Sequence, residues 1–327
     1  MRPTLLIDRS DRARIQITGA HAVATLNGLL TNDVAALKPG HGQYAAALSA
    51  KGKIVADVVV LMTGDGLQLH ASPEAAPGLR AMLTKFVNPR FATLADVSES
   101  TAELTLVGNE AVEILARASD ASTDADTLAA LSPFWHIAAT LGSIPVIVMQ
   151  LPRIGASNLS VYSVIAARAS KESVIAALQA AGAVHGDGAT LERLRVESGF
   201  PLWGIDMDEN TLPQEANLDD MHAVSYTKGC YIGQETVARI HFRGHVNRSL
   251  RRLVFAGGAE PPRGAVLQDS EHRAIGDVRS IVRSEGEGLI GIGMVRREID
   301  DGQTIDVHWE GGGTTAVVTG KAKGAID

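Results

Sequence analysis

Strand-like and helix-like hydrophobic patterns alternate along this chain up to about residue 244. Residues 14–18 read RIQIT, in which every second side chain is apolar, the pattern of a strand with one buried face. The following segment spaces Val23, Leu26 and Leu30 by three or four residues, which places them on one side of a helix. This alternation predicts strand-helix-strand units of the α+β class. The sequence contains no GxGxxG or P-loop motif, which argues against a doubly wound nucleotide-binding fold.

The same reasoning locates most of the other elements. A β-hairpin is expected from two β-prone runs, 44–48 and 54–61, which a glycine-containing turn separates. Residues 119–133 are polar and rich in alanine, so we expect a surface connection there. Ser170 and Thr190 are expected to cap the helices that follow them, because their hydroxyls can accept from free N–H groups. Further strands are expected at 67–70, 92–96, 103–107, 144–150 and 160–165, and further helices at 74–86, 109–116, 171–181 and from about 190.

The texture of the sequence changes after Arg248. Short β-prone runs such as LRRLVF and GLIGIGMV follow one another with glycines between them, which is typical of a small antiparallel barrel. We therefore predict an α+β region over residues 1–244 and a C-terminal β-barrel over residues 245–327.

Composition narrows the classes of function. The chain carries 37 Asp and Glu against 30 Lys and Arg, and its formal charge of -7 disfavours general attraction to nucleic acid or to an anionic membrane. Cys230 is the only cysteine, so neither an intramolecular disulfide nor a cysteine-rich metal site can form within one chain. No apolar run approaches the ~20 residues that cross a bilayer, and the first residues resemble no targeting signal. The sequence predicts a cytoplasmic protein without a metal site, a nucleic-acid partner or a membrane partner.

The most informative segment is residues 228–235, which read KGCYIGQE. Cys230 lies just ahead of a helix expected to begin near Ile232, and Lys228 is close in sequence. A helix N-terminus and an ammonium group both favour the thiolate, so a reactive sulfur is one hypothesis; a small buried hydrophobic residue is the other. Between residues 228 and 252, six Lys or Arg stand against the single acid Glu235. We expect a local cationic stripe here, or a plain solvated surface.

A second cluster, residues 195–206, combines a carboxylate, aromatic rings and glycine turns. The carboxylate of Glu197 could accept paired N–H donors from a pterin-like ring, while Phe200 and Trp203 supply stacking area. The alternative is that Glu197 pairs with Arg195 or another basic group and that Trp203 packs in a core.

Together these segments resemble the YgfZ family, relatives of the glycine-cleavage T-protein (an aminomethyltransferase) that include mitochondrial iron-sulfur assembly factors. The resemblance spans nearly the whole chain, and the octapeptide at 228–235 is its most specific part. In the N-terminal half it is carried by Leu30-Thr31-Asn32-Asp33-Val34, Gly42, Tyr44, Gly52-Lys53-Ile54 and Asp57.

The resemblance implies three lobes around a central channel: two ferredoxin-like α+β lobes and a C-terminal antiparallel β-barrel. It also implies that the channel holds tetrahydrofolate or a one-carbon derivative of it. The residues assigned in this way to folate binding are Tyr44, Asp57, Glu197, Phe200, Trp203 and Arg239. The functional thiol is assigned to Cys230 with Lys228 beside it, and the rest of the signature to Gly229, Tyr231, Gly233, Gln234 and Glu235.

One departure from the T-protein pattern bears on mechanism. Where a catalytic acid is expected after the hairpin, this chain has Pro77, and only Glu74 nearby could substitute. The leading hypothesis is therefore a tetrahydrofolate-binding protein that supports assembly or repair of iron-sulfur proteins, with client or assembly proteins as partners. The alternative is a folate-dependent aminomethyltransferase or demethylase. A third hypothesis, a thiol hydrolase, would use Cys230 as the nucleophile and one of three histidines as the base: His222, His241 or His245.

Overall fold

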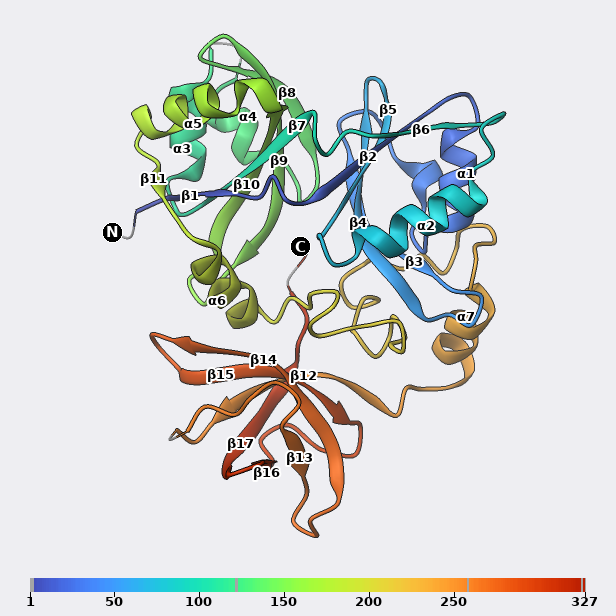
Figure 1. Ribbon diagram of the computed structural model, residues 1–327, viewed down its shortest axis with the longest axis vertical. Helices are drawn as coiled ribbons and strands as arrows, with labels where there is room; N and C mark the ends of the chain where they lie inside the picture. Colours follow the sequence, from blue (N-terminus) through green and yellow to red (C-terminus); the bar gives the residue numbers. More distant parts are fainter. Residues whose placement is uncertain (1–2, 121–122, 258, 325, 327) are drawn as a thin grey trace.

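The computed structural model describes residues 3–120, 123–257, 259–324 and 326. Two α+β lobes lie side by side, and a β-barrel lies below them (Figure 1). The predicted fold class, two ferredoxin-like lobes and a C-terminal antiparallel barrel, is confirmed.

Lobe A contains a six-stranded sheet in the order β11-β1-β7-β10-β9-β8. Three helices pack on one face of this sheet (Figure 1), where Ile114 and Leu115 of α3 meet Leu106 of β7 in the core. The strands are β1 (Leu5–Asp8), β7 (Thr101–Val107), β8 (His136–Leu141), β9 (Ile144–Ile154), β10 (Leu159–Ala167) and β11 (Val184–His185), and the helices are α3 (Ala111–Ala118), α4 (Ala125–Ala129) and α5 (Lys171–Ala180).

Lobe B contains a five-stranded sheet in the order β3-β4-β5-β2-β6. Both isoleucines of the RIQIT strand, Ile15 and Ile17, face its core, together with Leu26 of α1 and Leu79 of α2. The strands are β2 (Ala13–Thr18), β3 (Gly42–Leu48), β4 (Ile54–Thr63), β5 (Gly66–Ala71) and β6 (Thr93–Asp96), and the helices are α1 (Ala22–Leu29), the short 3-10 helix η1 (Val34–Ala36) and α2 (Ala76–Phe86).

The barrel closes through six strands in the order β12-β15-β14-β13-β16-β17. Gly276 shows how closely its strands approach, since a Cβ there would lie 1.9 Å from the carbonyl oxygen of Met294, and only glycine fits. The boundary expected at residue 245 stays a prediction; the first barrel strand begins at Arg248. The strands are β12 (Arg248–Phe255), β13 (Val266–Gln268), β14 (Ala274–Ser284), β15 (Gly288–Arg296), β16 (Thr304–Trp309) and β17 (Gly312–Lys321).

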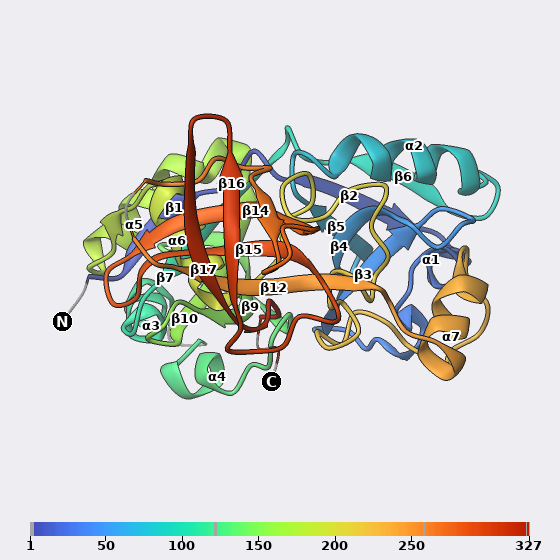
Figure 2. The ribbon, with the colours of Figure 1, turned by 90° about the horizontal axis from the view of Figure 1, so that it is seen from below.

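Two helices and a long irregular segment connect the lobes to the barrel. Helix α6 (Gly188–Ser198) lies between lobe A and the barrel, and α7 (Gln234–Arg243) lies at the outer edge of the molecule beside lobe B (Figures 1 and 2). Buried Asn217 in the irregular segment donates to the carbonyl oxygens of Leu250 at 2.8 Å and Ala322 at 2.9 Å. The segment is thereby hydrogen-bonded to the first strand of the barrel and to the residue that follows its last strand.

Several local predictions need correction. Thr190 does not cap α6; the cap is Asp187, whose carboxylate accepts from the backbone N–H of Thr190 at 2.8 Å. Ser170 precedes α5, but its side chain makes no capping hydrogen bond. The predicted connection at 119–133 contains helix α4, and its residues 121 and 122 lie outside the described residues. The helix expected to begin near Ile232 begins at Gln234, still within the octapeptide and two residues later than expected.

The two α+β lobes are joined by a buried ionic cluster around Glu103 of β7. Its carboxylate lies 3.0 Å from His70 Nδ1 and 3.6 Å from Arg14 Nη1, both in lobe B, and accepts from Ser163 of lobe A at 3.0 Å. Burial alone would raise the pKa of Glu103, but Arg12, His70 and Arg14 outweigh it and hold this pKa well below its usual value. The cluster therefore adds a charged, hydrogen-bonded contact to the apolar packing between the lobes, in which Tyr44 and Val59 of lobe B share a core with Ile165 of lobe A.

We expect Glu103→Gln to lower the free energy of unfolding by about 3 to 5 kcal/mol at pH 7, because the guanidinium of Arg14 would keep its buried position without a counter-charge. Chemical denaturation measures this. The same substitution at exposed Glu99 in the β6–β7 turn is the control and should cost under about 0.5 kcal/mol. Because the folded pKa of Glu103 lies below the ordinary 4.5, the wild-type advantage should persist above pH 4.5 and shrink below it. A loss at Glu103 no larger than the loss at Glu99 would contradict this role.

Candidate functional site

A cavity of about 410 Å³ lies where the two sheets, α6 and the C-terminal segment meet. Lobe B contributes Tyr44 of β3, Asp57 of β4 and His70 of β5, and lobe A contributes Glu103 of β7. Its volume falls in the range of roughly 300 to 1,000 Å³ that is usual for pockets that bind small molecules. Much of the remaining wall is apolar, formed by side chains that include Val59, Phe134, Met149, Leu151, Ile154 and Phe200.

The polar end of the cavity is organised by Asp57. The hydroxyl of Tyr44 donates to Asp57 Oδ2 at 2.8 Å, while Asp57 Oδ1 is buried without a hydrogen-bond partner in the structure. Burial raises the pKa of Asp57, more than the Tyr44 hydrogen bond and the nearby Arg12 lower it. Arg12 Nε is also buried without a hydrogen bond and lies 3.5 Å from Glu103 Oε1. One carboxylate oxygen and one guanidinium nitrogen of the cavity-lining residues are thus buried without a hydrogen bond, which is unfavourable for polar atoms.

Helix α6 presents one face to the cavity, with Gly188, Leu191, Glu192 and Arg195 three or four residues apart. The guanidinium of Arg195 bonds Glu192 at 2.6 Å, Asp206 at 2.7 Å and the hydroxyl of Ser280 in the barrel at 2.7 Å, and it also donates to the Phe200 carbonyl. Arg195 therefore anchors α6 to the barrel while its side chain forms part of the cavity wall.

Three of the six residues predicted to bind folate line this cavity: Tyr44, Asp57 and Phe200. The other three are not in its lining. Buried Glu197 pairs with Arg193 at 2.8 Å, and the Trp203 indole donates to the Val55 carbonyl at 2.5 Å from a position between two cores. Arg239 is exposed on α7. The predicted folate roles of these three residues stay predictions.

Sequence reasoning missed Arg12, Glu192 and Arg195 as cavity residues. The spacing of Leu191, Glu192 and Arg195 marks them as one helical face, which is the one signal that could have found two of them. Nothing local in the sequence marks Arg12, which enters the site only because β1 and β2 belong to different lobes.

Pro77 does not decide whether the cavity holds an acid. It lies exposed in the first turn of α2, and neither it nor exposed Glu74 lines the cavity. Asp57, one strand earlier, is an acid that does line the cavity, and burial raises its pKa. The expectation that Pro77 disfavours one-carbon transfer stays a prediction.

Lys228 does not extend toward solvent as a free ammonium. Its Nζ donates to the carbonyl oxygens of Asn27 at 2.5 Å, Leu30 at 2.8 Å and Asn32 at 2.7 Å, which closes the C-terminal end of α1. Burial lowers the pKa of Lys228 to about 8. Lys228 thus holds the octapeptide against lobe B.

Cys230 is exposed, so the alternative of a small buried hydrophobic residue is wrong. Two residues of the signature are packed close to it: Tyr231 is buried, and Gly233, with φ of 83°, packs so closely on the β3–β4 turn that a Cβ would lie 2.6 Å from the Ser49 carbonyl oxygen. The side-chain oxygen of Gln234 accepts from the Tyr231 N–H at 3.3 Å. Lys228 and Gly233 therefore hold the octapeptide against lobe B while the thiol of Cys230 is exposed to solvent. We call this segment, residues 228–235, the mount.

The histidines proposed for a thiol hydrolase do not bond the thiol. Among the described residues, no hydrogen bond joins Cys230 to His222, His241 or His245, and His241 instead stacks on Tyr226 with ring centroids 3.6 Å apart. In the same described ranges, no group of three or more His, Cys, Asp or Glu side chains is arranged to hold a metal ion. No helix in these ranges is long and apolar enough to cross a membrane.

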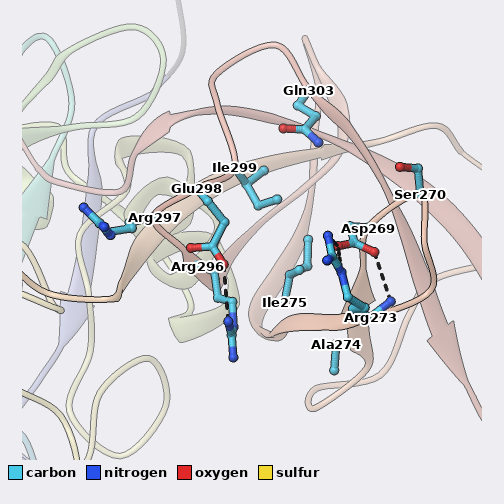
Figure 3. A pocket seen from close by; sticks show the side chains of 10 residues that line it. All are labelled: Asp269, Ser270, Arg273, Ala274, Ile275, Arg296, Arg297, Glu298, Ile299 and Gln303. Carbon is cyan, nitrogen blue, oxygen red and sulfur yellow. Dashed lines mark hydrogen bonds and ion pairs between the residues drawn. The ribbon is translucent and has the colours of Figure 1, made fainter.

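A second hollow, of about 860 Å³, lies on the barrel (Figure 3). Its charged side chains satisfy one another: Arg273 pairs with Asp269 at 2.7 Å and Arg296 with Glu298 at 3.3 Å. Arg297 points away from it (Figure 3). Although it is the larger hollow, it lies apart from every predicted site residue, and the junction cavity is the better candidate site.

Comparison with known proteins agrees with this geometry. The GCVT N-terminal domain matches residues 3–227, a span that includes both sheets and α6. The chain belongs to this family. A solved structure similar to it is the glycine cleavage system aminomethyltransferase T from Bartonella henselae, with a TM-score of 0.82 and 21% identity over 97% of this chain and 85% of that one. This likeness supports the three-lobed fold.

Two curated relatives extend the comparison. The tRNA-modifying protein YgfZ of Yersinia enterocolitica is 26% identical over 81% of this chain and 76% of its own length. The mitochondrial iron-sulfur cluster assembly factor IBA57 homolog of Mycosarcoma maydis is 27% identical over 78% of this chain, which spans 58% of that relative. The resemblance drawn from the octapeptide and the hairpin is confirmed.

We expect Lys228→Met to lower the free energy of unfolding at pH 7 by about 1 to 3 kcal/mol, because three carbonyl groups lose a charged donor. Thermal and urea unfolding measure it, and exposed Lys51→Met is the matched control with little expected change. The pKa of Lys228 is about 8 when folded and 10.5 when free, so the unfolded chain binds the extra proton between these values. The wild-type advantage should therefore grow as pH rises from 8 toward 10.5. An advantage that shrinks over this range would contradict the assignment.

Proposed function

We propose that this protein binds tetrahydrofolate or a one-carbon derivative in the junction cavity and supports the assembly or repair of iron-sulfur proteins. The names of its two curated relatives point to tRNA modification and to iron-sulfur assembly. Membership of the GCVT family supports a folate-sized ligand in the cavity between the lobes. We place the protein in the cytoplasm because its single exposed thiol suits a reducing compartment.

One observation carries the folate assignment: two residues of the cavity lining, Asp57 and Arg12, each keep a buried polar atom without a hydrogen bond, and much of the wall around them is apolar. A reduced pterin ring carries N–H donors beside a carbonyl acceptor on a flat body of low polarity. It would satisfy Asp57 Oδ1 and Arg12 Nε while its faces pack against side chains such as Phe200. In this proposal Tyr44 fixes the rotamer of Asp57 and so orients the carboxylate toward the ring.

The exposed thiol supports the iron-sulfur part of the proposal. One cysteine cannot supply the four thiolates of a conventional cluster, so any cluster contact must involve ligands from another protein. Cys230 stands outside the cavity lining, on the mount that Lys228 and Gly233 hold against lobe B. We infer that the thiol faces a client or assembly protein while the folate stays in the cavity.

Asp57 also favours a second candidate, a folate-dependent aminomethyltransferase or demethylase. A buried carboxyl group with a raised pKa can hold or release a proton beside a bound folate nitrogen. Incubation with tetrahydrofolate and an aminomethylated carrier protein, with detection of methylene-tetrahydrofolate, separates the two. Turnover that Asp57→Asn abolishes would establish the enzyme, whereas folate binding without turnover favours the maintenance role.

We expect Asp57→Asn to weaken tetrahydrofolate binding at least tenfold in calorimetric titration, because the ring would lose a charged acceptor. The same change at exposed Asp65, in the β4–β5 turn, should leave the affinity unchanged. Folded stability at pH 7 should rise or stay level, since burial of the Asp57 charge is unfavourable and asparagine can still accept from Tyr44. That gain should shrink as pH falls through the raised pKa and vanish below 3.8, where the carboxyl is protonated in both states. Equal affinity of both variants would remove Asp57 from the site.

We expect Cys230→Ser to keep the wild-type melting temperature and folate affinity, because the thiol is exposed and lies outside the cavity lining. The variant should nevertheless fail to restore iron-sulfur enzyme activity in cells that lack their own YgfZ-type protein. Exposed Ser157→Ala serves as the control for a small polar surface change and should restore that activity fully. Full rescue by Cys230→Ser would show that the thiol has no part in the function.

A further inference from the structure

The cationic stripe seen in the sequence divides into two kinds of residue in the structure. Four of its six cations are engaged within the protein: Lys228 with the carbonyls that end α1, Arg248 with Glu215, Arg251 with Asp301 and Arg252 with Glu287. Within the described residues, the side chains of Arg239 and Arg243 have no hydrogen bond or ion pair. Both are exposed and lie one turn apart on α7.

Between these two arginines lies the most exposed large apolar side chain of the described residues. Phe242 is 66% exposed, three residues after Arg239 and one before Arg243, so the three share the outer face of α7. Val237 is the buried residue of this helix and holds its other face against the body of the protein. Burying a phenyl ring is favourable by about 1.5 to 3 kcal/mol relative to leaving it in water, so a partner that covered Phe242 would gain binding free energy there.

The ring does not hang freely on the surface. Phe242 meets His241 edge-on at 4.8 Å and Tyr226 edge-on at 6.0 Å, and those two rings stack on each other. Tyr226 is in turn held by Gln214 at 3.2 Å. Such preorganised aromatic side chains flanked by arginine are typical of the residues that dominate protein-protein binding energy.

We infer that the face formed by Arg239, Phe242 and Arg243, the α7 face, docks an acidic segment of a partner protein in which an apolar side chain lies between carboxylates. Charge complementarity selects this occupant: the chain as a whole carries -7, yet this face has two guanidinium groups without an ion pair among the described residues, and they outnumber Glu235, the one acid of α7, which lies on the same side of the helix one turn before Arg239. A single ring between two arginines suits a short peptide segment better than a nucleic-acid strand, which needs a longer basic track.

Helix α7 lies next to Cys230 in the chain. The helix projects at the outer edge of the molecule in both views (Figures 1 and 2), and it begins within the mount that presents Cys230. A partner held on the α7 face is therefore brought to the side of the protein that carries the exposed thiol. The α7 face would then be the surface of this protein that binds its iron-sulfur client or assembly protein. The identity of that partner rests on the proposed function.

Peptide selection tests the inference without folate or cells. A random 12-residue phage library is panned against the full chain and against the Arg239→Ala/Phe242→Ala/Arg243→Ala variant, after both are shown to melt at the same temperature and to give the same circular dichroism spectrum. We expect the wild type to enrich peptides with an apolar residue between Asp or Glu, and synthetic copies of these peptides to bind the variant at least tenfold more weakly by fluorescence anisotropy. Arg283→Ala/Arg296→Ala, which removes two exposed barrel arginines, is the matched control and should bind like the wild type.

Two results would overturn the inference. One is enrichment that is the same on wild type and variant, or that favours no acidic peptides. The other is tight binding of a single-stranded uridine decamer that is lost in the triple variant, since this would assign the face to nucleic acid. Neither result depends on folate binding, so either can occur while the proposed cavity function stands.

Discussion

The buried carboxylate of Glu103 is the point on which the rest of the arrangement depends. It is the common partner of side chains from both α+β lobes, and it also lines the cavity between them. A junction of this kind is unfavourable to take apart, because each separated charge would be left in a low-dielectric interior without its counter-charge. The hydrogen bonds at Glu103 also depend on direction, so they restrict the angle between the two sheets more narrowly than apolar packing does. The shape of the cavity is thus a consequence of the same contacts that hold the lobes together.

Two carboxylates on the cavity wall illustrate how position determines chemistry. Glu103 has cations around it, and its pKa lies far below the ordinary value, so its charge is fixed. Asp57 has a neutral phenol as its hydrogen-bond partner and a raised pKa, so its charge can respond to a ligand. Environments that separate two acids in this way are the usual means by which a site obtains one permanent charge and one exchangeable proton.

Much of the fold followed from periodicity. The RIQIT strand, the hairpin and the glycine-punctuated barrel were predictable because each buries one face and repeats its apolar residues accordingly. The edge strands β8 and β11 were missed: β11 has two residues, and β8 contains alanines and threonine that signal neither strand nor helix strongly. The cap at Asp187 was missed because several polar residues compete near that helix start, and only tertiary packing decides among them.

The candidate site was less predictable than the fold. Tyr44 and Asp57 could be found because the hairpin carries them at recognisable positions, but Arg12 joins them only through the pairing of distant strands. The ammonium of Lys228 was expected to favour the thiolate of Cys230. In the structure it instead donates hydrogen bonds to three carbonyl oxygens in lobe B. Residues that are close in sequence share a loop. The position of the charged end of a long side chain, however, depends on hydrogen-bond acceptors from distant parts of the chain.

The strand order of lobe A has a consequence for how the molecule is made. Strand β1 pairs with β7 and β11, and all of lobe B, from β2 to β6, is inserted between β1 and those partners. During synthesis the five strands of lobe B, which follow one another in the chain, can therefore form their sheet first. At that stage β1 has no partner strand, because β7 and β11 have not yet been made. Closing lobe A then requires contacts of long sequence separation, which form slowly. The four residues of β1 therefore keep unpaired backbone groups until β7 has been made, by which time lobe B can already be folded.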